Sequence, residues 1–193
     1  NGLDENALVI FTSDNGGAGY IGLPDVNDPY RGWKGSFFEG GIRVPFLARW
    51  PARLPSGSTY TAPVHHFDIY TTAAATAGAD LPTDRPIDGV DLMPYLINTD
   101  LTDTPHEHLF FRSGAAQAVR DERWKLVVSA PQGLPRKEWL FDLTSDGEWN
   151  NLLAEQPEVA NRLRDALEAH NSEQTEPLWP WITTTARNID RDI

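Results

Sequence analysis

The chain has 193 residues, of which 40% are hydrophobic and seven are tryptophan, so it can bury a substantial core and global disorder is not expected. Its formal net charge of −12 argues against a binding surface for nucleic acid or anionic membranes, so any anion must be bound in a local pocket. The absence of cysteine excludes disulfides, thiolate metal sites and a cysteine-derived nucleophile within this sequence. No apolar run approaches the length of a membrane span and no signal-peptide pattern is present, and these observations do not identify a compartment.

The first expected element is a strand over Ala7–Phe11, an apolar run that we predict to be buried on both faces. The turn Thr12–Gly17 (TSDNGG) follows it and places the carboxylate of Asp14 beside the amide of Asn15. Open α/β sheets bind their ligands at the carboxyl ends of the strands. These two oxygen-bearing side chains are therefore candidate metal ligands, although Asp-Asn-Gly-Gly taken alone is more often a simple turn.

Residues 16–36 are rich in Gly, Pro, Asp and Asn and are predicted to form a long irregular loop, a kind of segment that is usually functional in a compact domain. The segment Arg31–Pro45 (RGWKGSFFEGGIRVP) carries a single lysine, Lys34, close to glycines. A second strand is expected over Ile42–Trp50, with Pro45 near an edge or a bulge. A hard-cation site next to a lysine is suited to an oxyanion.

Two helices are predicted in the next part of the chain. The first runs from His66 to Ala77, is rich in alanine, and ends at Gly78 in a position typical of a left-handed cap. The second is short: Asp91 is a candidate cap, and the helix runs through Leu96 and bends around Pro94.

Beyond about residue 100 the sequence predicts four short strands joined by tight polar turns, which is typical of an antiparallel meander. The expected strands are Glu107–Arg112, Ala115–Arg120, Arg123–Ser129 and Glu138–Leu143. A helix is expected from Pro157 to about His170, because proline occupies its first turn and apolar residues follow at helical spacing. Residues 172–193 are expected to form an irregular tail whose tryptophans dock onto the protein rather than bind sugar.

These elements predict an α/β fold in two parts: an α/β part over residues 1–100, and a small α+β subdomain with an irregular tail over residues 101–193. A domain built on a parallel sheet does not normally begin with a single buried central strand. We therefore expect the chain to be the latter part of a longer protein.

Two segments together resemble the type I, formylglycine-dependent sulfatases: Thr12–Gly17 and, about twenty residues later, the run from Gly32 to Pro45. Their order and spacing are specific. Weaker similarities follow at His66–Gly78, Asp88–Leu92, Arg123–Leu126 and Leu140–Leu143, so the resemblance covers about residues 3–171. The chain is similar to the second half of such a sulfatase.

This resemblance implies that residues 1–100 are the C-terminal part of a sulfatase α/β catalytic domain, with a partial alkaline-phosphatase-like sheet. Residues 101–193 would then be the family's C-terminal subdomain, a small four-stranded antiparallel sheet with a C-terminal helix. It also implies hydrolysis of sulfate esters with a calcium ion and a formylglycine made from Cys or Ser. By position, Asp14 and Asn15 would be two of the metal ligands, and Lys34 would be a catalytic residue that contacts the sulfate group. The family's Cys/Ser-x-Pro-x-Arg segment is absent from these 193 residues, as are its early aspartate pair and the histidines and lysine of its middle loops. We therefore expect the chain to be inactive by itself and its calcium site to be incomplete, because two ligands seldom suffice for calcium.

Other polar residues have plainer interpretations. Glu39 and Arg43 could touch substrate, but a structural ion pair or backbone bonds that hold the loop are favoured. His65 and His66 are adjacent and cannot form an i, i+4 metal pair on a helix, so we expect them at the surface or at the helix start. His106 and His108 alternate on an expected strand, and a ligand role is disfavoured there as well.

Three functions stay open at this point. The leading one is part of a sulfuric ester hydrolase that acts on a sulfate ester such as a sulfated glycan and whose other half is missing or supplied separately. The second is a phosphonate or phosphate ester hydrolase of the same superfamily, since a metal and a lysine serve either chemistry. The third is a non-catalytic module that binds a partner chain or self-associates through exposed apolar surface. The resemblance is compatible with a periplasmic or extracellular location, which the sequence does not decide.

Overall fold

The computed structural model describes residues 2–23, 25–98, 103–130, 134–145 and 147–175. These residues fold into two compact units. The first comprises the residues up to Phe11 together with Leu47–Leu109, and the second comprises Thr12–Phe46 together with the residues from Phe110 onward. The expected tail, residues 172–193, lies outside the described residues from residue 176 on.

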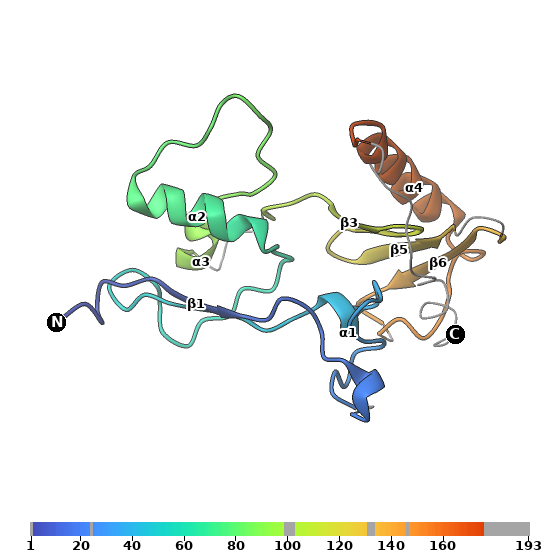
Figure 1. The fold of residues 1–193 in the computed structure, drawn as a ribbon, viewed down its shortest axis with the longest axis horizontal. Helices are drawn as coiled ribbons and strands as arrows, with labels where there is room; N and C mark the ends of the chain where they lie inside the picture. The colour runs from blue at the N-terminus through green and yellow to red at the C-terminus, as the bar shows by residue number, and fades with distance from the viewer. Residues whose placement is uncertain (1, 24, 99–102, 131–133, 146, 176–193) are drawn as a thin grey trace. The chain divides into compact units, whose positions relative to one another are not determined.

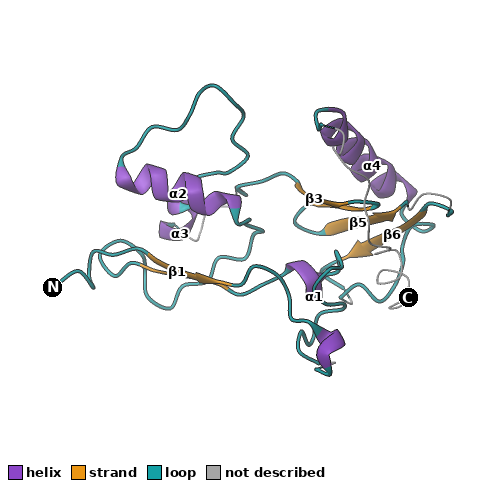
Figure 2. Cartoon of the chain, viewed as in Figure 1, coloured by secondary structure: helices purple, strands orange, loops and turns teal. Residues whose placement is uncertain are grey.

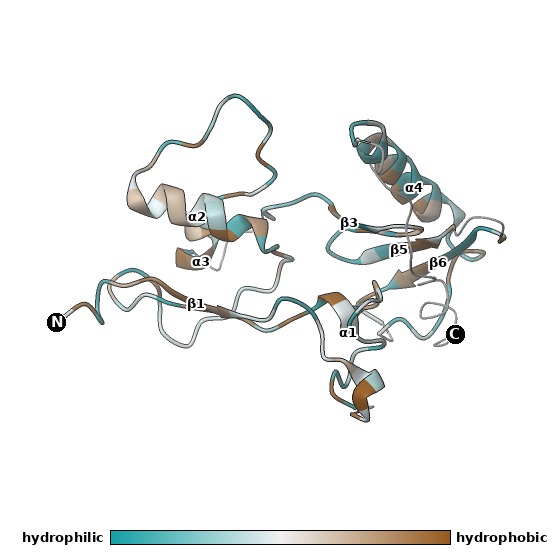
Figure 3. Cartoon of the chain, in the orientation of Figure 1, coloured by the Kyte–Doolittle hydropathy of each residue, from teal (hydrophilic) through white to brown (hydrophobic). Residues whose placement is uncertain are grey.

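A two-stranded sheet is formed by β1 (Val9–Thr12) and β2 (Phe46–Arg49). Exposed and half-buried positions alternate along both strands, and Phe11 keeps 66% of its surface exposed. The prediction of a first strand buried on both faces is therefore wrong. An apolar run is covered on both sides only where layers pack on both faces of its sheet, and the described part of this sheet exposes alternate side chains. Figure 3 shows the hydrophobic colouring along β1.

The second expected strand begins four residues later than predicted. Its first predicted residue, Ile42, is instead the last residue of the short helix α1 (Glu39–Ile42), and Pro45 lies just before β2 rather than within it. Because Gly40 and Gly41 of α1 have no side chain, the backbones of other segments approach this helix closely, as described below.

Helix α2 (Phe67–Ala77) confirms the predicted helix, and Gly78 caps it in the left-handed conformation with φ 68°. Asp68 in its first turn is fully buried, and its carboxylate accepts the backbone N–H groups of His65 (2.7 Å) and Val90 (2.9 Å). The ring Nε2 of His106 also lies 2.9 Å from Asp68. Asp68 thus joins the start of the helix to two later segments.

Helix α3 (Met93–Ile97) follows, and its cap residue is Leu92 rather than the predicted Asp91. The carboxylate of Asp91, one residue earlier, accepts the N–H of Met93 at 3.0 Å. Pro94 lies in the first turn of this helix, so the predicted bend around it is wrong. Proline is tolerated there because the first turn has no intrahelical partner for an N–H.

The second sheet confirms the predicted meander, in the order β3-β4-β5-β6. Its strands are β3 (Leu109–Ser113), β4 (Ala116–Arg120), β5 (Trp124–Ser129) and β6 (Lys137–Asp142). The β4–β5 and β5–β6 pairs are antiparallel, with Val119 opposite Leu126 and Leu126 opposite Leu140.

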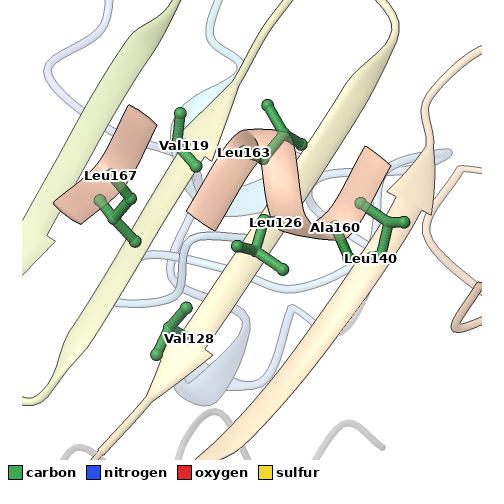
Figure 4. Packing of buried hydrophobic residues seen from close by; sticks show 7 residues of the cluster. All are labelled: Val119, Leu126, Val128, Leu140, Ala160, Leu163 and Leu167. Carbon is green, nitrogen blue, oxygen red and sulfur yellow. The ribbon is translucent and has the colours of Figure 1, made fainter. Parts of the chain in front are cut away.

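Helix α4 (Pro157–Ser172) covers one face of this sheet, as Figures 1 and 2 show, and confirms the most regular of the predicted helices. Its residues Ala160, Leu163 and Leu167 pack against apolar side chains of the strands. Figure 4 shows these contacts with Val119, Leu126, Val128 and Leu140. Burial of this apolar layer, at about 25 cal/mol per Å², is the main stabilising term on this side of the sheet.

The opposite face of the same sheet is covered by Phe38, which is fully buried among Ala118, Val127 and Phe141. The rings of Phe38 and Phe141 meet edge to face with centroids 5.9 Å apart. The loop that carries the sequence motifs is therefore part of the hydrophobic core of the second unit.

The architecture confirms the expected α/β class with a four-stranded antiparallel sheet and a C-terminal helix. The expected domain boundary near residue 100 stays a prediction. Among the described residues, no helix combines the length and the apolar character needed to cross a bilayer.

Candidate functional site

The turn that carries Asp14 and Asn15 follows β1 directly, as the sequence predicts. The hydroxyl of Ser13 donates to the carbonyl of Asn15 at 2.8 Å and closes the turn. Asp14 is exposed and Asn15 is half-buried, so both side chains can reach solvent or a ligand. Just after them, the N–H of Gly16 donates to the carbonyl of Gly41 at 3.0 Å and attaches the turn to helix α1.

Asn27 holds the long loop against this turn. Its side-chain oxygen accepts the N–H of Gly17 at 2.6 Å, and its side-chain amide donates to the carbonyls of Gly17 and Gly32, each at 3.0 Å. A carboxamide that bonds three backbone groups fixes the loop without adding charge beside the turn. Sequence reasoning missed this role, because an asparagine in a polar loop looks like many others.

Lys34 lies beside the same turn. Its backbone N–H donates to the carbonyl of Gly17 at 3.1 Å, and its side chain is exposed. The structure therefore brings the backbone of Lys34 next to the turn that carries Asp14 and Asn15. The metal-ligand roles of Asp14 and Asn15 and the sulfate contact of Lys34 stay predictions.

A buried group of charges lies behind this loop. Glu39, only 2% exposed, pairs with Lys125 of β5 at 2.8 Å and with Arg120 of β4 at 3.1 Å. Arg43 approaches it at 3.7 Å, which confirms the structural ion pair that was favoured over a substrate contact. Burial alone raises the pKa of the Glu39 carboxyl, but the charges of Lys125 and Arg120 outweigh this effect, so the pKa lies below its ordinary value.

Glu148 completes this group. Its Oε1 lies 2.7 Å from the ammonium of Lys125, and its Oε2 accepts the backbone N–H of Glu39 at 2.6 Å. Its carbonyl accepts a hydrogen bond from the Arg31 guanidinium at 2.7 Å. Burial raises the pKa of Glu148, although Lys125 opposes the shift. We call Glu39, Lys125 and Glu148, with Arg120, the buried ion cluster.

Most of this cluster could not be read from the sequence. Lys125 occupies an apolar strand beside Leu126, and its partner Glu39 is 86 positions away. The available signal was weak: a lysine in the middle of a predicted core strand is expected to have a buried partner.

Chemically, the turn offers a carboxylate and an amide oxygen, which fit part of the six to eight oxygen ligands of calcium. Lys34, whose backbone N–H bonds the carbonyl of Gly17, carries a compact positive charge. Within the part of the chain that the structure describes, no group of three or more His, Asp or Glu side chains is arranged to hold a metal ion. The metal-ligand role of Asp14 and Asn15 therefore stays a prediction.

Comparison with known proteins agrees with these motifs. The family model described as Sulfatase matches residues 1–79. Steryl-sulfatase of Mus musculus is 37% identical over 87% of this chain, and N-acetylgalactosamine-6-sulfatase of Canis lupus familiaris is 39% identical over 64% of it. The solved structure of the PsFucS1 sulfatase from Pseudoalteromonas sp. superposes with a TM-score of 0.73 at 25% identity over 89% of this chain.

The matched regions are parts of longer proteins. The chain covers 32% of the mouse relative, 24% of the canine relative and 38% of the Pseudoalteromonas structure. The residues that the family model matches include the segments Thr12–Gly17 and Gly32–Pro45. These matches show that the chain is similar to part of a sulfatase, and they support a place in the sulfatase family of the alkaline-phosphatase-like superfamily.

Proposed function

We propose that this chain supplies the metal-binding and sulfate-binding part of a sulfuric ester hydrolase, and that it is inactive without a sulfatase amino-terminal half. In this proposal Asp14 and Asn15 are two ligands of a calcium ion, and Lys34 binds the sulfate group. The single observation that carries the proposal is the pair of backbone bonds around the turn: Gly16 to Gly41 and Lys34 to Gly17 hold the two motif segments together.

The chemistry of these groups fits that role. Bound calcium would neutralise charge on the sulfate oxygens, and the use of one amide limits the negative charge that faces the anion. Lys34 would donate hydrogen bonds to the same oxygens and stabilise charge as it moves toward the leaving group. The nucleophile is not among these residues: the sequence contains neither cysteine nor a Ser-x-Pro-x-Arg segment from which a formylglycine could be made.

The substrate is proposed to be a sulfate ester, with a sulfated glycan as one class. The names of the relatives point to two classes, since one is a steryl-sulfatase and another an N-acetylgalactosamine-6-sulfatase. The proposed partner is the remaining part of a sulfatase fold, which would cover apolar side chains of β1 and β2 such as Phe11 and Leu47.

Reconstitution tests this proposal. The chain is co-expressed with the amino-terminal half of a related sulfatase that carries its formylglycine, and turnover of an aryl sulfate is measured at saturating calcium. We expect activity only when both parts are present. Asp14→Ala, Asn15→Ala and Lys34→Ala should each lower kcat/KM by about 10²-fold or more, because each removes a group that stabilises transition-state charge.

Asp25→Ala is the matched control, because Asp25 is an exposed carboxylate of the same loop and should leave the rate unchanged. Turnover by the chain alone would contradict the claim that a second half is required. Full activity in both Asp14→Ala and Lys34→Ala would show that the site is assigned to the wrong residues. Faster turnover of an aryl phosphate than of the aryl sulfate would favour the phosphatase alternative.

A further inference from the structure

The two motif segments meet at a junction formed by Gly16, Gly40 and Gly41. The N–H of Gly16 bonds the carbonyl of Gly41, and the N–H of Gly40 donates to the carbonyl of Arg31 at 2.7 Å. A Cβ atom on Gly16 would overlap the carbonyl oxygen of Gly40, and one on Gly40 would overlap the carbonyl of Gly32. Helix α1 is thus in backbone contact with the turn at Gly16 and with the loop at Arg31 and Gly32, so a small movement of α1 would disturb both contacts.

Helix α1 is too short to hold this position through its own hydrogen bonds, since it has four residues. It is held from the sheet instead. Its first residue, Glu39, is fixed at the carboxylate by Lys125 and at the backbone N–H by Glu148. Every member of this connection is buried: Lys125 and Glu148 are 0% exposed and Glu39 is 2% exposed.

Glu148 adopts an unfavourable backbone conformation, with φ of 79° in the left-handed region. A residue other than glycine holds such a conformation only when its surroundings determine it, and this strain is typical of functional sites. Here the side chain of Glu148 contacts Lys125 and the N–H of Glu39, and its carbonyl accepts from Arg31, just upstream of Lys34. One residue therefore fixes both ends of the segment that carries the lysine.

We propose that Lys125, Glu39 and Glu148 are positioning residues, which hold helix α1 so that the turn of Asp14 and Asn15 stays beside Lys34. They touch neither metal nor substrate, and they act through the Gly16–Gly41 and Lys34–Gly17 backbone bonds. The inference deepens the proposed function and rests on it for the meaning of the positioned residues. What the inference adds is that contacts with the sheet, made through the buried ion cluster, fix the position of the two motif segments.

Amide hydrogen exchange of the ¹⁵N-labelled full chain tests this coupling. In Lys125→Met, the amides of Gly16, Gly40 and Lys34 should exchange about tenfold faster or more relative to the amides of α4, because local opening of the loop becomes easier than opening of the helix. Lys125→Arg, which keeps the charge, should restore part of the protection.

Leu163→Ala is the matched control. It destabilises the core on the α4 side of the sheet and should speed exchange in α4 without a selective effect at Gly16 or Lys34. A change in Lys125→Met that is uniform over the second unit, or confined to Glu39, would overturn the proposal. Should Lys125→Met not fold, Glu148→Gln is measured in its place, and unchanged relative rates at Gly16 and Lys34 would overturn the proposal equally.

The exchange measurement needs no metal, sulfate or second half. If exchange at Gly16, Gly40 and Lys34 is not selectively faster in Lys125→Met, only the positioning role is contradicted. Unchanged turnover in the reconstituted Asp14→Ala and Lys34→Ala variants contradicts the proposed function alone. In the reconstituted enzyme, Lys125→Met should lower kcat more than it raises KM, whereas a role limited to stability would change only the amount of active protein.

Discussion

Gly16→Ala is expected to be among the most damaging single substitutions in the chain. The new methyl group would overlap the carbonyl oxygen of Gly40, and because this neighbour is a backbone atom, no change of rotamer relieves the overlap. We expect a loss of about 3 kcal/mol in the free energy of unfolding, at the upper end for overpacking, together with loss of the Gly16–Gly41 hydrogen bond. Urea unfolding followed by circular dichroism measures the loss.

Gly19→Ala provides the control for this prediction. A Cβ on Gly19 would lie 3.2 Å from the ring of Trp33, and a side chain can move where a backbone cannot. The expected cost is below about 1 kcal/mol. Equal urea midpoints for Gly16→Ala and Gly19→Ala would contradict the close approach of the two motif segments.

The second large effect is expected from Lys125→Met. This substitution keeps the length of the side chain but removes the ammonium group that lies between the carboxylates of Glu39 and Glu148. Glu39 then keeps its pair with Arg120, but Glu148 loses the ammonium 2.7 Å from its carboxylate. Breaking a buried ion pair in this way costs about 3–5 kcal/mol. Arg164→Met, which removes the partly exposed pair with Glu138, should cost less than about 1 kcal/mol. Similar losses in both variants would contradict the burial of the cluster.

The contributions of Glu39 and Glu148 to the free energy of unfolding should also change with pH in opposite directions. The pKa of Glu39 is lowered, so its stabilisation is present above about pH 4.5 and is lost as the pH falls through the lowered value. The pKa of Glu148 is raised, so its stabilisation is present below about pH 4.5 and is lost as the pH rises through the raised value. Between about pH 4 and pH 7, the stability advantage of the wild type over Glu39→Gln should therefore grow, and its advantage over Glu148→Gln should shrink.

The parts of the fold that the sequence predicts are those whose signals are local. Helix α4 follows from Pro157 and the apolar spacing after it, and the four strands β3 to β6 follow from short β-rich runs between turns. Helix α2 follows in the same way, and Gly78 marks its end correctly. The TSDNGG turn and Lys34 were found because their spacing resembles a known family, and the structure places their backbones in contact.

The parts that the sequence does not predict depend on residues far apart in the chain. Glu39 lies 86 positions from Lys125 and 109 from Glu148, so no local pattern connects them. Helix α1 was not predicted, and its last residue Ile42 was predicted to begin a strand, because its glycines carry no helical signal and its position is fixed by residues far away in the chain. The apolar run of β1 predicted burial that the described residues do not provide, since composition does not reveal how many layers cover a strand.

The central claim is that Asp14, Asn15 and Lys34 converge on one cation and one sulfate group. The most direct measurement is a crystal structure of the chain reconstituted with a sulfatase amino-terminal half, grown with calcium and inorganic sulfate. The account predicts calcium within about 2.3–2.6 Å of the Asp14 and Asn15 side-chain oxygens. It also predicts the Lys34 ammonium within about 3 Å of a sulfate oxygen. A cation and a sulfate held by other residues, with these three side chains turned away from both, would contradict it.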